Sequence, residues 1–428
     1  MTLADQGDSA AVKIAYLTGE YPAVSHTFIL REIEALRALG ADVITCSIRR
    51  TPPSQQPGPA EKAAAASTFY VLAAARNPLT LLGAQLAALA APRRYFSTLA
   101  LAWRTSAPGL KALLWQMFYF AEAAVLARHL AAQGVTHLHN HFGNSSANVA
   151  LLTSALSGIP FSYTLHGPAE FYEPRRWRLD EKTRHARFVS CISHFCRSQA
   201  MYFSDPTDWH KLRIIHCGVI PALYERRATD AHATPAKAGT HFVFVGRVVA
   251  VKGLRVLLEA VAQARKAVPD MHLTLVGDGD DRTMLEAEAK AAGLQDTVTF
   301  TGYKAQSEVA AILETADVFV LPSFAEGLPV ALMEALASET PVIATRVAGV
   351  AELVEEGLHG YLVSPGDSDG LAAKMIEMAQ DPDARARMGA AGRAKVAREF
   401  DVAHEAALLR ELFYGRGGDA PRPQLPDS

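Results

Sequence analysis

Short apolar runs alternate with segments of helical periodicity along most of the chain. In the first half, the runs that predict buried strands are Val12–Leu17, Asp42–Ile48, Val135–Asn140, Phe161–Leu165, Phe188–Ile192 and Leu212–Ile215. In the second half, they are His241–Val245, His272–Val276, Val298–Thr301, Val318–Leu321, Val342–Ala344 and Gly360–Val363. Strands that alternate with helices form parallel sheets covered by helices on both faces. The pattern therefore predicts an α/β fold with two doubly wound, Rossmann-like domains.

A break in this pattern separates the two halves. Residues 221–240 are mostly small and polar and lack helical periodicity, which is typical of an exposed linker. We therefore expect an N-terminal domain over 1–220 and a C-terminal domain over 241–400. A helical segment at 401–415 follows, and we expect the Gly- and Pro-rich tail at 416–428 to be disordered.

Residues 52–133 are longer than an ordinary crossover between strands and form a predicted helical insertion. Its aromatic and basic side chains include Trp103, Trp115, Phe118, Tyr119, Phe120, Arg93, Arg94, Arg104 and Lys111. This mixture suits helices that rest on an anionic membrane face, and it equally suits a helical hairpin that covers its own core. Arg76 and Pro78 interrupt the apolar stretch 63–91, so no transmembrane helix is predicted there.

Composition and charge limit the classes of function that the chain can have. With 428 residues, half of them apolar, the chain can bury two substantial cores. A net charge of −2 and the lack of a basic block argue against binding to nucleic acid. The four cysteines form no C-x-x-C pair, which indicates a reducing compartment. The first ten residues have no signal-peptide pattern, so we expect the protein to stay in the cytoplasm.

Two carboxylates lie eight positions apart in the segment FVLPSFAEGLPVALMEALASETPVIATRVAGVAELVEEGLHGYLVSP. Glu326 is predicted in the loop after a strand, and Glu334 in a helix from about Leu328 to Ala337 with Pro329 in its first turn. The free N–H groups and positive dipole end of this helix suit a diphosphate. Glu334 can accept hydrogen bonds from neighbouring hydroxyls such as those of a ribose. Taken alone, both could also be ordinary solvated carboxylates at a helix end.

A second cluster follows the predicted strand 241–245. Gly246 ends the strand, and Arg247 and Lys252 lie just before the next helix. The planar fork of an Arg and the mobile charge of a Lys can together offset the charge that develops on a diphosphate leaving group. An isolated Arg and Lys near a turn would more often be solvated surface charges.

Two further loops at strand ends could let the backbone approach a nucleotide. Gly277 and Gly279 follow the strand 272–276, although a G-x-G turn alone is often only a tight exit from a strand. Gly302 and Tyr303 follow the strand 298–301.

The first half contributes histidines near strand ends. His166 precedes Gly167 directly after the strand 161–165, and a lone His there is more often structural. His137, His139 and His141 alternate along one strand and so lie on one face, which makes a metal site conceivable. No adjacent carboxylate triad accompanies them in the sequence, so we predict no metal site.

The segment 319–365 resembles the E-x(7)-E signature of retaining family-4 glycosyltransferases (glycosyl transferases group 1). The resemblance includes the GLP after Glu326, the PVIAT strand, the turn at Gly349 and the GYLVSPGD segment. The GR and KG pairs at 246–253 and the loops at 277–280 and 301–303 also match the family, with Asp280 where Pro is common. The segment 21–33 resembles the P-x-x-S-E-T-F-I start of exopolysaccharide and colanic-acid-type enzymes. His26 replaces the usual Glu there, which puts the acceptor in doubt.

The resemblance implies a GT-B architecture, in which two Rossmann-like domains face a central cleft and the last helix packs back on the N-terminal domain. It assigns catalytic roles to Arg247 and Lys252 at the leaving group, to Glu326 at the donor sugar and to His166 as an orienting hydrogen-bond donor. It assigns substrate binding to Glu334, Ser25, Gly246, Gly277, Gly279, Tyr303, Gly327, Leu328, Pro329, His139 and His141, the two histidines as residues that line the cleft. Ser25 could also simply cap the following helix.

The predicted function is that of a retaining glycosyltransferase that uses a UDP- or GDP-linked sugar and needs no further cofactor. The resemblance implies a lipid-linked or oligosaccharide acceptor in exopolysaccharide assembly, with possible peripheral contact to the inner membrane face. A sugar-nucleotide epimerase or a phosphorylase of related fold is an alternative. A non-catalytic sugar-nucleotide-binding protein is another, although the intact set of charged residues argues against it.

Overall fold

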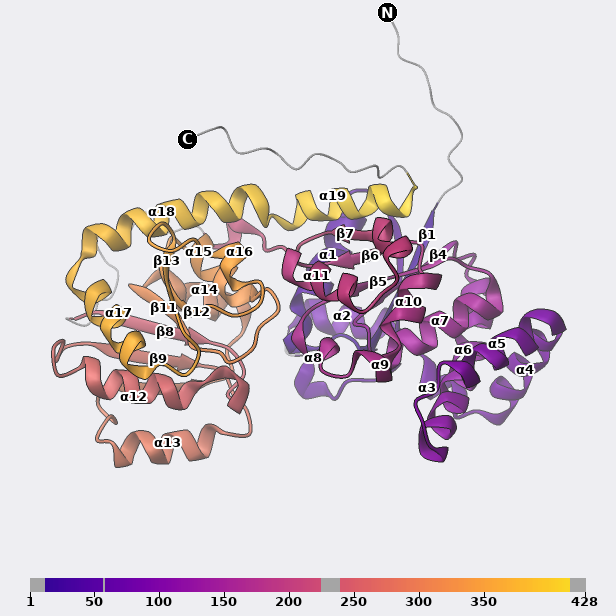
Figure 1. Cartoon of the computed structure of the whole chain (residues 1–428), viewed down its shortest axis with the longest axis horizontal. Helices are drawn as coiled ribbons and strands as arrows, with labels where there is room; N and C mark the ends of the chain where they lie inside the picture. Colours follow the sequence, from indigo (N-terminus) through magenta and orange to yellow (C-terminus); the bar gives the residue numbers. More distant parts are fainter. Residues whose placement is uncertain (1–11, 57, 225–238, 416–428) are drawn as a thin grey trace, which may run out of the picture. The chain divides into compact units, whose positions relative to one another are not determined.

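A computed structural model describes residues 12–56, 58–224 and 239–415, apart from the side chains of Ser25 and Ser54. The chain forms two compact units (Figure 1). The first unit comprises Met1–His216 and Ala403–Ser428, and the second comprises Cys217–Val402. Most of the predicted linker, 225–238, and the predicted disordered tail, 416–428, lie outside the described residues.

The first unit is built on a seven-stranded sheet with the order β3-β2-β1-β4-β5-β6-β7. All of its strand pairs are parallel. The strands are β1 (Lys13–Glu20), β2 (Asp42–Arg49), β3 (Phe69–Tyr70), β4 (His137–His141), β5 (Phe161–Leu165), β6 (Val189–Cys191) and β7 (Leu212–Ile214). Six of them were predicted, whereas β3 has two residues and is too short to produce a periodic pattern.

Helices flank both faces of this sheet (Figure 1). They are α1 (Thr27–Ala38), α2 (Pro59–Ser67), α3 (Val71–Ala75), α4 (Pro78–Leu89), α5 (Pro92–Arg104), α6 (Leu110–Ala132), α7 (Ser145–Ser157), α8 (Pro168–Phe171), α9 (Pro174–Trp177), α10 (Leu179–His185), α11 (His194–Tyr202) and α19 (Val402–Phe413). Short 3-10 helices are η1 (Val24–His26), η2 (Pro53–Gln55) and η3 (Pro206–Lys211).

The C-terminal helix α19 belongs to the core of the first unit. Ala406, Leu409 and Phe413 are buried in one cluster with residues of β1 and α1, among them Ile14 and Ile33. The carboxylate of Glu405 also accepts a hydrogen bond of 2.7 Å from the backbone N–H of His216. Apolar packing and this bond together join the end of the chain to the first sheet.

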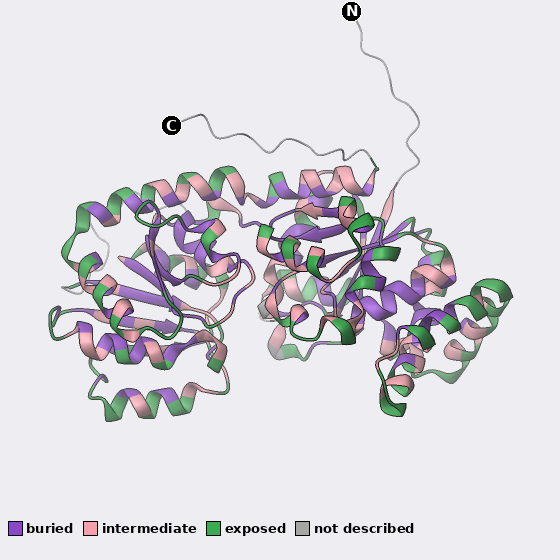
Figure 2. Ribbon diagram, in the orientation of Figure 1, coloured by how far each residue is buried: buried purple, intermediate pink, exposed green. Residues whose placement is uncertain are grey.

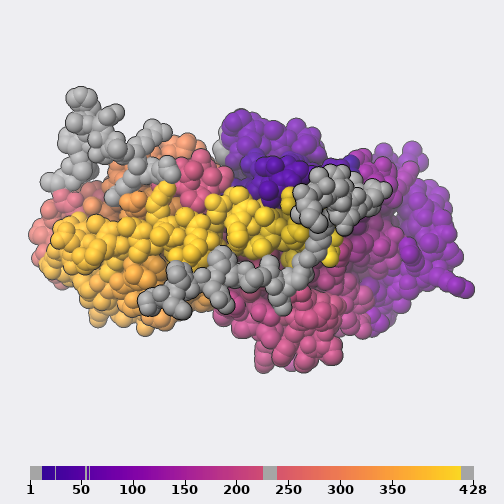
Figure 3. All heavy atoms as spheres, turned by 90° about the horizontal axis from the view of Figure 1, so that it is seen from above, coloured from indigo at the N-terminus to yellow at the C-terminus, as the bar shows by residue number. Residues whose placement is uncertain are grey.

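The insertion carries most of the exposed large apolar side chains of the described residues. These are Leu79, Leu82, Leu86 and Leu89 on α4, Phe96 and Trp103 on α5, and Leu110, Leu114, Trp115 and Phe118 on α6. In Figure 1, α4 and α5 project from the rest of the first unit, and in Figure 3 the violet-coloured part of the chain forms the outer edge of that unit. Among the described helices, α6 alone is long and apolar enough to cross a membrane. Its second half is buried against α7, as expected of a core helix.

The second unit is built on a six-stranded parallel sheet with the order β10-β9-β8-β11-β12-β13. The strands are β8 (His241–Val245), β9 (His272–Val276), β10 (Val298–Gly302), β11 (Val318–Leu321), β12 (Val342–Thr345) and β13 (Gly360–Val363). The helices are η4 (Pro221–Tyr224), η5 (Ala250–Lys252), α12 (Leu254–Ala264), α13 (Arg282–Ala291), α14 (Gln306–Glu314), α15 (Val330–Ala337), α16 (Val350–Leu353), α17 (Ser368–Gln380) and α18 (Pro382–Glu399). Figure 2 shows the strands of this sheet as mostly buried.

The start of the predicted linker is part of the second unit. Residues 221–224 form η4, in which Tyr224 is only 2 % exposed. Its hydroxyl donates a hydrogen bond of 2.8 Å to Oε1 of Glu334. This contact could not be predicted from the sequence. Small and polar residues follow Tyr224, and the burial of Tyr224 depends on the fold of the second unit.

Candidate active site

The order of the strands places a candidate site in each unit. In doubly wound sheets, ligands bind at the carboxyl ends of the strands where the strand order reverses. In the second sheet this point lies between β8 and β11, whose ends lead into residues 246–253 and 322–329. In the first sheet it lies between β1 and β4.

In the second unit, the side chains of Lys252, Glu326 and Ser323 meet at this point. Lys252 and Glu326 were predicted as site residues, and Ser323 was not. Nζ of Lys252, in η5 after β8, lies 2.5 Å from Oε1 of Glu326, in the loop after β11. The hydroxyl of Ser323 donates to the same carboxylate oxygen at 2.5 Å. The backbone carbonyl of Ser323 in turn accepts a hydrogen bond from the hydroxyl of Thr345. The structure thus joins Lys252 and Glu326, which are 74 positions apart in sequence, into one ion pair.

Arg247 lies beside this pair in sequence but is exposed. Within the described part of the chain it forms no ion pair, whereas Lys252 is held by Glu326. Arg247 and Lys252 have the same predicted role, but their surroundings differ. Lys252 is held by a carboxylate, and Arg247 is exposed to solvent.

Glycines allow the backbones of three strand ends to approach closely. A Cβ on Gly277, whose φ is +137°, would lie 1.8 Å from the carbonyl oxygen of Gly246. A Cβ on Gly279 would lie 2.3 Å from the carbonyl oxygen of Val248. The N–H of Gly277 also donates to the carbonyl of Gly302 at 2.9 Å. These glycines are thus required by backbone packing, apart from any contact with a ligand.

Glu334 is buried in α15, and its carboxylate has a partner in η4. Besides the bond to Oε1 of Glu334, the hydroxyl of Tyr224 accepts a bond of 3.1 Å from Nε2 of Gln306. Tyr224 and Gln306 were not predicted as site residues. A Tyr in a polar segment and a Gln at the start of a helix carry no signal for this role in the sequence.

The loop before α15 and the loop after β10 hold the remaining predicted residues of this unit. The helix begins at Val330, with Pro329 at its N-cap, so it is shorter at its start than predicted. Leu328 is buried, and the carbonyl of Gly327 accepts a hydrogen bond of 3.1 Å from Gly349. Tyr303 is 49 % exposed and thus accessible to a ligand.

In the first unit, the carboxyl ends of β4 and β5 bring two histidines together. Nδ1 of His141 lies 2.8 Å from Nε2 of His166. The rings of Phe28 and Phe142 flank His166, at centroid distances of 4.8 and 4.6 Å. Burial, followed by the charges of His141 and His26, holds the pKa of His166 well below its usual range, so this ring is neutral.

A buried carboxylate holds the loop that carries His166. Glu170 accepts hydrogen bonds from the backbone N–H groups of His166 at 2.6 Å, of Gly167 at 3.2 Å, and of Gly143. Burial raises the pKa of Glu170 to about 7, although these three donors and Lys182 act in the opposite direction. The neighbouring Phe142 has a φ of 72°, a strained conformation for a bulky residue. Neither Glu170 nor Phe142 was predicted as a site residue.

His139 and His141, which were predicted to line a cleft, are fully buried. The ring nitrogens of His139 lie 2.7 Å from the hydroxyl of Ser162 and 2.9 Å from that of Thr164. Hydroxyls of the adjacent strand β5 thus satisfy this ring inside the unit. The sequence could not show this pairing, because it depends on the register of the two strands.

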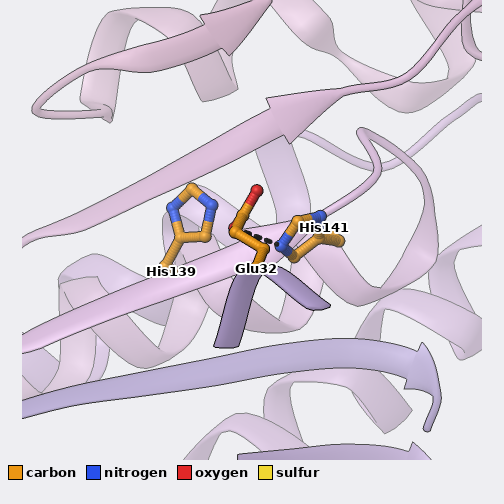
Figure 4. Close-up of side chains that lie close together, drawn as sticks. All are labelled: Glu32, His139 and His141. Carbon is orange, nitrogen blue, oxygen red and sulfur yellow. Dashed lines mark ion pairs between the residues drawn. The ribbon is translucent and has the colours of Figure 1, made fainter. Parts of the chain in front are cut away.

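A carboxylate that the sequence did not place near the histidines lies beside them. Glu32, on α1, contributes an oxygen within 4.8 Å of nitrogen atoms of His139 and His141, a grouping that could hold a metal ion (Figure 4). Its Oε1 lies 3.3 Å from Nε2 of His141 and accepts a hydrogen bond of 2.7 Å from the hydroxyl of Tyr16. Glu32 is distant from these histidines in sequence, so this single carboxylate was not considered when a metal site was judged absent, and that absence stays a prediction.

The segment 21–33 leads from β1 into α1 beside this cluster. Ser25 lies in η1, and its side chain is outside the described part of the structure. The N-cap of α1 is His26 and not Ser25, and the side chain of His26 makes no capping hydrogen bond. The ring of His26 instead packs 4.9 Å from that of Phe142.

Two family profiles match the chain, one in each half. Residues 25–223 match the profile described as Glycosyltransferase Family 4, and residues 227–395 match that of Glycosyl transferases group 1. The chain is 27 % identical to a Salmonella typhimurium protein named for colanic acid biosynthesis, the glycosyltransferase WcaL, over 94 % of this chain and 98 % of that protein. It is 30 % identical to the D-inositol 3-phosphate glycosyltransferase of Pseudarthrobacter chlorophenolicus, over 65 % of this chain and 70 % of that protein.

A third relative matches over a shorter length. The chain is 32 % identical to the amylovoran biosynthesis glycosyltransferase AmsK of Erwinia amylovora, over 45 % of this chain and 47 % of that protein. This match thus spans about half the length of AmsK.

Solved structures show the same fold. HepE of Anabaena, crystallised in complex with UDP, has a TM-score of 0.70 at 18 % identity and covers 94 % of this chain and 100 % of its own. Sucrose-phosphate synthase of Thermosynechococcus elongatus has a TM-score of 0.71 at 22 % identity, over 94 % and 98 %. Both similarities support an architecture of two Rossmann-like domains of the GT-B type.

Proposed function

The chain belongs to the family-4 glycosyltransferases, and from this we propose that it transfers a sugar, with retention of configuration, from a nucleoside-diphosphate sugar to a lipid-linked or oligosaccharide acceptor. The names of WcaL and AmsK support a place in exopolysaccharide assembly. The UDP complexes of HepE support a nucleotide-sugar donor. The observation that carries the proposal is the contact between Lys252 and Glu326 at the reversal point of the second sheet.

The proposed chemistry begins at the bond between the anomeric carbon and the diphosphate. As that bond breaks, negative charge develops on the departing phosphate oxygen, and a cation held nearby stabilises it. Lys252 is already fixed by Glu326, while the exposed Arg247 can close on the diphosphate when the donor binds. The new bond to the acceptor oxygen forms on the same face of the sugar, and the departing phosphate takes up the acceptor proton.

The two carboxylates have separate proposed roles. Glu326 binds a hydroxyl of the donor sugar, and Ser323 and Lys252 fix its position. Glu334 binds the ribose, and Tyr224 fixes one of its oxygens. Carboxylates that are held in place before the substrate arrives lose less conformational entropy when it binds.

We also propose that the reaction needs no metal ion, because Arg247, Lys252 and the N–H groups at the start of α15 balance the diphosphate. The enzyme is expected to keep its activity in EDTA. Complete loss of activity that added Mg²⁺ or Mn²⁺ restores would contradict this part of the proposal.

The proposed location is the cytoplasmic face of the membrane, with the insertion as the contact surface. From 62 to 121 the chain has six Lys or Arg residues and no Asp or Glu. The exposed apolar side chains of α4, α5 and α6 lie in the same segment. Exposed apolar and cationic side chains in one segment suit an anionic bilayer.

The decisive experiment is a transfer assay with UDP- and GDP-linked hexoses and a lipid-linked sugar acceptor. The proposal expects a product whose new linkage has the anomeric configuration of the donor, as NMR can determine. An inverted linkage would contradict retention. An isomerised sugar nucleotide formed without acceptor would indicate an epimerase instead.

A further inference from the structure

Two buried side chains hold the turn between β4 and α7. The N–H of Gly143 donates a hydrogen bond to Oε1 of Glu170, and the carbonyl of Gly143 accepts one of 2.7 Å from Nζ of Lys182. Nζ of Lys182 also donates to the carbonyl of Asn144 at 3.1 Å. Glu170 lies on α8 and is 5 % exposed, whereas Lys182 lies on α10 and is fully buried. An acid and a base from different helices thus bind the two backbone polar groups of one residue.

The same carboxylate also holds the loop that follows β5. Oε2 of Glu170 accepts hydrogen bonds from the N–H groups of His166, at 2.6 Å, and of Gly167, at 3.2 Å. Glu170 therefore joins the carboxyl ends of β4 and β5 through backbone groups of both loops. These hydrogen bonds offset part of the free energy that the burial of a carboxyl group costs.

Glu170 and Lys182 also depend on each other electrostatically. Burial raises the pKa of Glu170 to about 7, and the backbone N–H groups and Lys182 oppose this shift. Burial likewise holds the pKa of Lys182 well below its usual range, and Glu170, followed by Asp180, opposes that shift. Loss of either partner would therefore leave the other one buried with less compensation.

The turn that these residues hold determines where the ring of Phe142 lies. Phe142 has a φ of 72°, a left-handed conformation that a bulky residue rarely adopts. The centroid of its ring lies 4.9 Å from that of His26, in η1, and 4.6 Å from that of His166. Phe142 and His166 are half-buried, beside the reversal point between β1 and β4. Backbone strain is often held at functional sites, and ligands bind at such reversal points.

We propose that Glu170 and Lys182 are positioning residues, which hold the turn 142–144 and thereby keep the ring of Phe142 against His166. The inference rests on the proposed function only in taking His166 as the predicted contact to the donor sugar. Glu170 acts on His166 by two routes, through its backbone N–H and through the ring of Phe142. Lys182 acts through the turn alone.

The first test uses the wild-type protein without substrate. Hydrogen exchange followed by NMR reports how firmly the N–H groups of Gly143, His166 and Gly167 are held. We expect each to exchange about 1,000-fold more slowly than in an unstructured peptide, because exchange requires the buried contacts to open. Exchange of these three groups at the rate of an unstructured peptide would overturn the proposal, whether or not any variant folds.

The Glu170→Gln variant tests the cause. A Gln at this position must place its NH₂ group against at least one of the three N–H donors. We expect the ring signals of His166 in ¹H–¹³C spectra to shift toward their positions in Phe142→Leu, and kcat/KM to fall about 10-fold, since small misplacements of a substrate-contacting group lower catalysis. His166→Asn identifies the signals. Unchanged His166 signals in a folded Glu170→Gln variant would overturn the proposal.

A matched control replaces another buried glutamate of the first unit. Glu122 lies on α6, outside the turn, so Glu122→Gln should change neither the His166 signals nor kcat/KM. Wild-type kcat/KM in a Glu170→Gln variant whose His166 signals have shifted would overturn the positioning role. The exchange and the ring signals need no substrate, so failure of the proposed transferase activity would be seen separately, in the transfer assay.

A double-variant cycle separates positioning from general stability. Lys182→Met removes the bonds to the two carbonyls of the turn and should lower kcat/KM in the same way. If Lys182 acts through Phe142, the Lys182→Met/Phe142→Leu variant should be as active as the less active of the two single variants. Losses that multiply in the double variant would overturn this route. Equal thermal unfolding of the compared variants excludes a difference in the folded fraction.

Discussion

Among the described residues, burial raises the pKa of carboxyl groups in the first unit but not in the second. In the first unit, burial raises the pKa values of Glu122 and Glu170 to about 7 and lowers that of His137 to about 3. In the second unit, the pKa values of Glu308 and Glu377 are lowered, by a backbone N–H at Ala305 and by Lys374 respectively. The first unit therefore encloses ionisable groups in its core, whereas the second keeps its shifted carboxyls in contact with donors near the surface.

This difference indicates that the two units contribute differently to the proposed reaction. Groups that must respond to a charged diphosphate need to reach it, and Arg247 and Lys252 are both on the surface or close to it. Groups that do not contact the diphosphate can be buried, as the ring of His141 is. Variants in the second unit should therefore change catalysis strongly, and variants at buried groups of the first unit should change stability and its pH dependence.

The largest effect is expected at the ion pair of the second unit. Lys252→Ala and Glu326→Gln should each lower kcat about 100-fold, because each removes a group that is proposed to act on the transition state. The matched control is Lys374→Ala, which breaks an exposed Lys–Glu pair of the same unit and should leave kcat unchanged. Steady-state kinetics on variants with unchanged thermal unfolding would check this. Wild-type turnover in folded Lys252→Ala would remove the main support for the proposed function.

Strands and surface motifs of the second unit could be predicted from the sequence. The strands His241–Val245 and Val318–Leu321 have the predicted bounds, because apolar runs with clear stop signals produce them. Lys252 and Glu326 were both singled out, but their contact was not, since it joins loops that are far apart in sequence. Proximity of this kind is a product of strand order and not of local pattern.

The buried partners could not be predicted. Three of these partners are Glu32, Glu170 and Tyr224. Nothing in the sequence around them distinguishes them from ordinary surface residues, and each is buried only by its neighbours in the fold. His139 was chosen for the right reason, its place on one face of a strand, but the register with β5 turns it toward Ser162 and Thr164. A sequence pattern indicates which face of a strand or helix a residue occupies. It does not indicate which residues pack against that face.

The insertion offers the next largest effect, and it tests whether the exposed apolar face of the first unit contacts lipid. Arg93 and Lys111 are exposed and form no ion pair with the described residues, so their replacement should leave the fold intact. Each cation near an anionic surface contributes about 1 kcal/mol, so Arg93→Gln/Lys111→Gln should weaken vesicle binding about 30-fold. Co-sedimentation with phosphatidylglycerol vesicles measures this.

The control for this experiment is Lys266→Gln/Lys290→Gln, which removes two exposed charges from the second unit. It should bind vesicles like the wild type. Equal binding of the wild type to anionic and neutral vesicles, or none to either, would show that the apolar face serves another purpose.

A smaller effect should separate the two carboxylates of the E-x(7)-E segment. Glu334→Gln loses a charged acceptor for the ribose hydroxyls, so the affinity for the free nucleoside diphosphate should fall about 10-fold. Glu326→Gln should leave that affinity nearly unchanged, since its proposed partner is the sugar. Isothermal titration of UDP or GDP distinguishes them. The reverse pattern would exchange the proposed positions of sugar and ribose.

The smallest effect concerns the buried carboxyl of Glu122 on α6, which lies in the first unit and outside the proposed chemistry. Burial raises its pKa to about 7, and Arg49 acts in the opposite direction. Because the folded state favours the protonated form, the free energy of unfolding should fall as pH rises from about 4.5 to about 7. Glu122→Gln has no proton to lose, so its stability relative to the wild type should rise by about 2 kcal/mol between pH 5 and pH 8. Urea unfolding at both pH values measures this, with the half-buried Glu61→Gln as control. An equal difference at the two pH values would mean that Glu122 ionises as freely as a surface group, and the contrast between the units would then be confined to the histidines and Glu170.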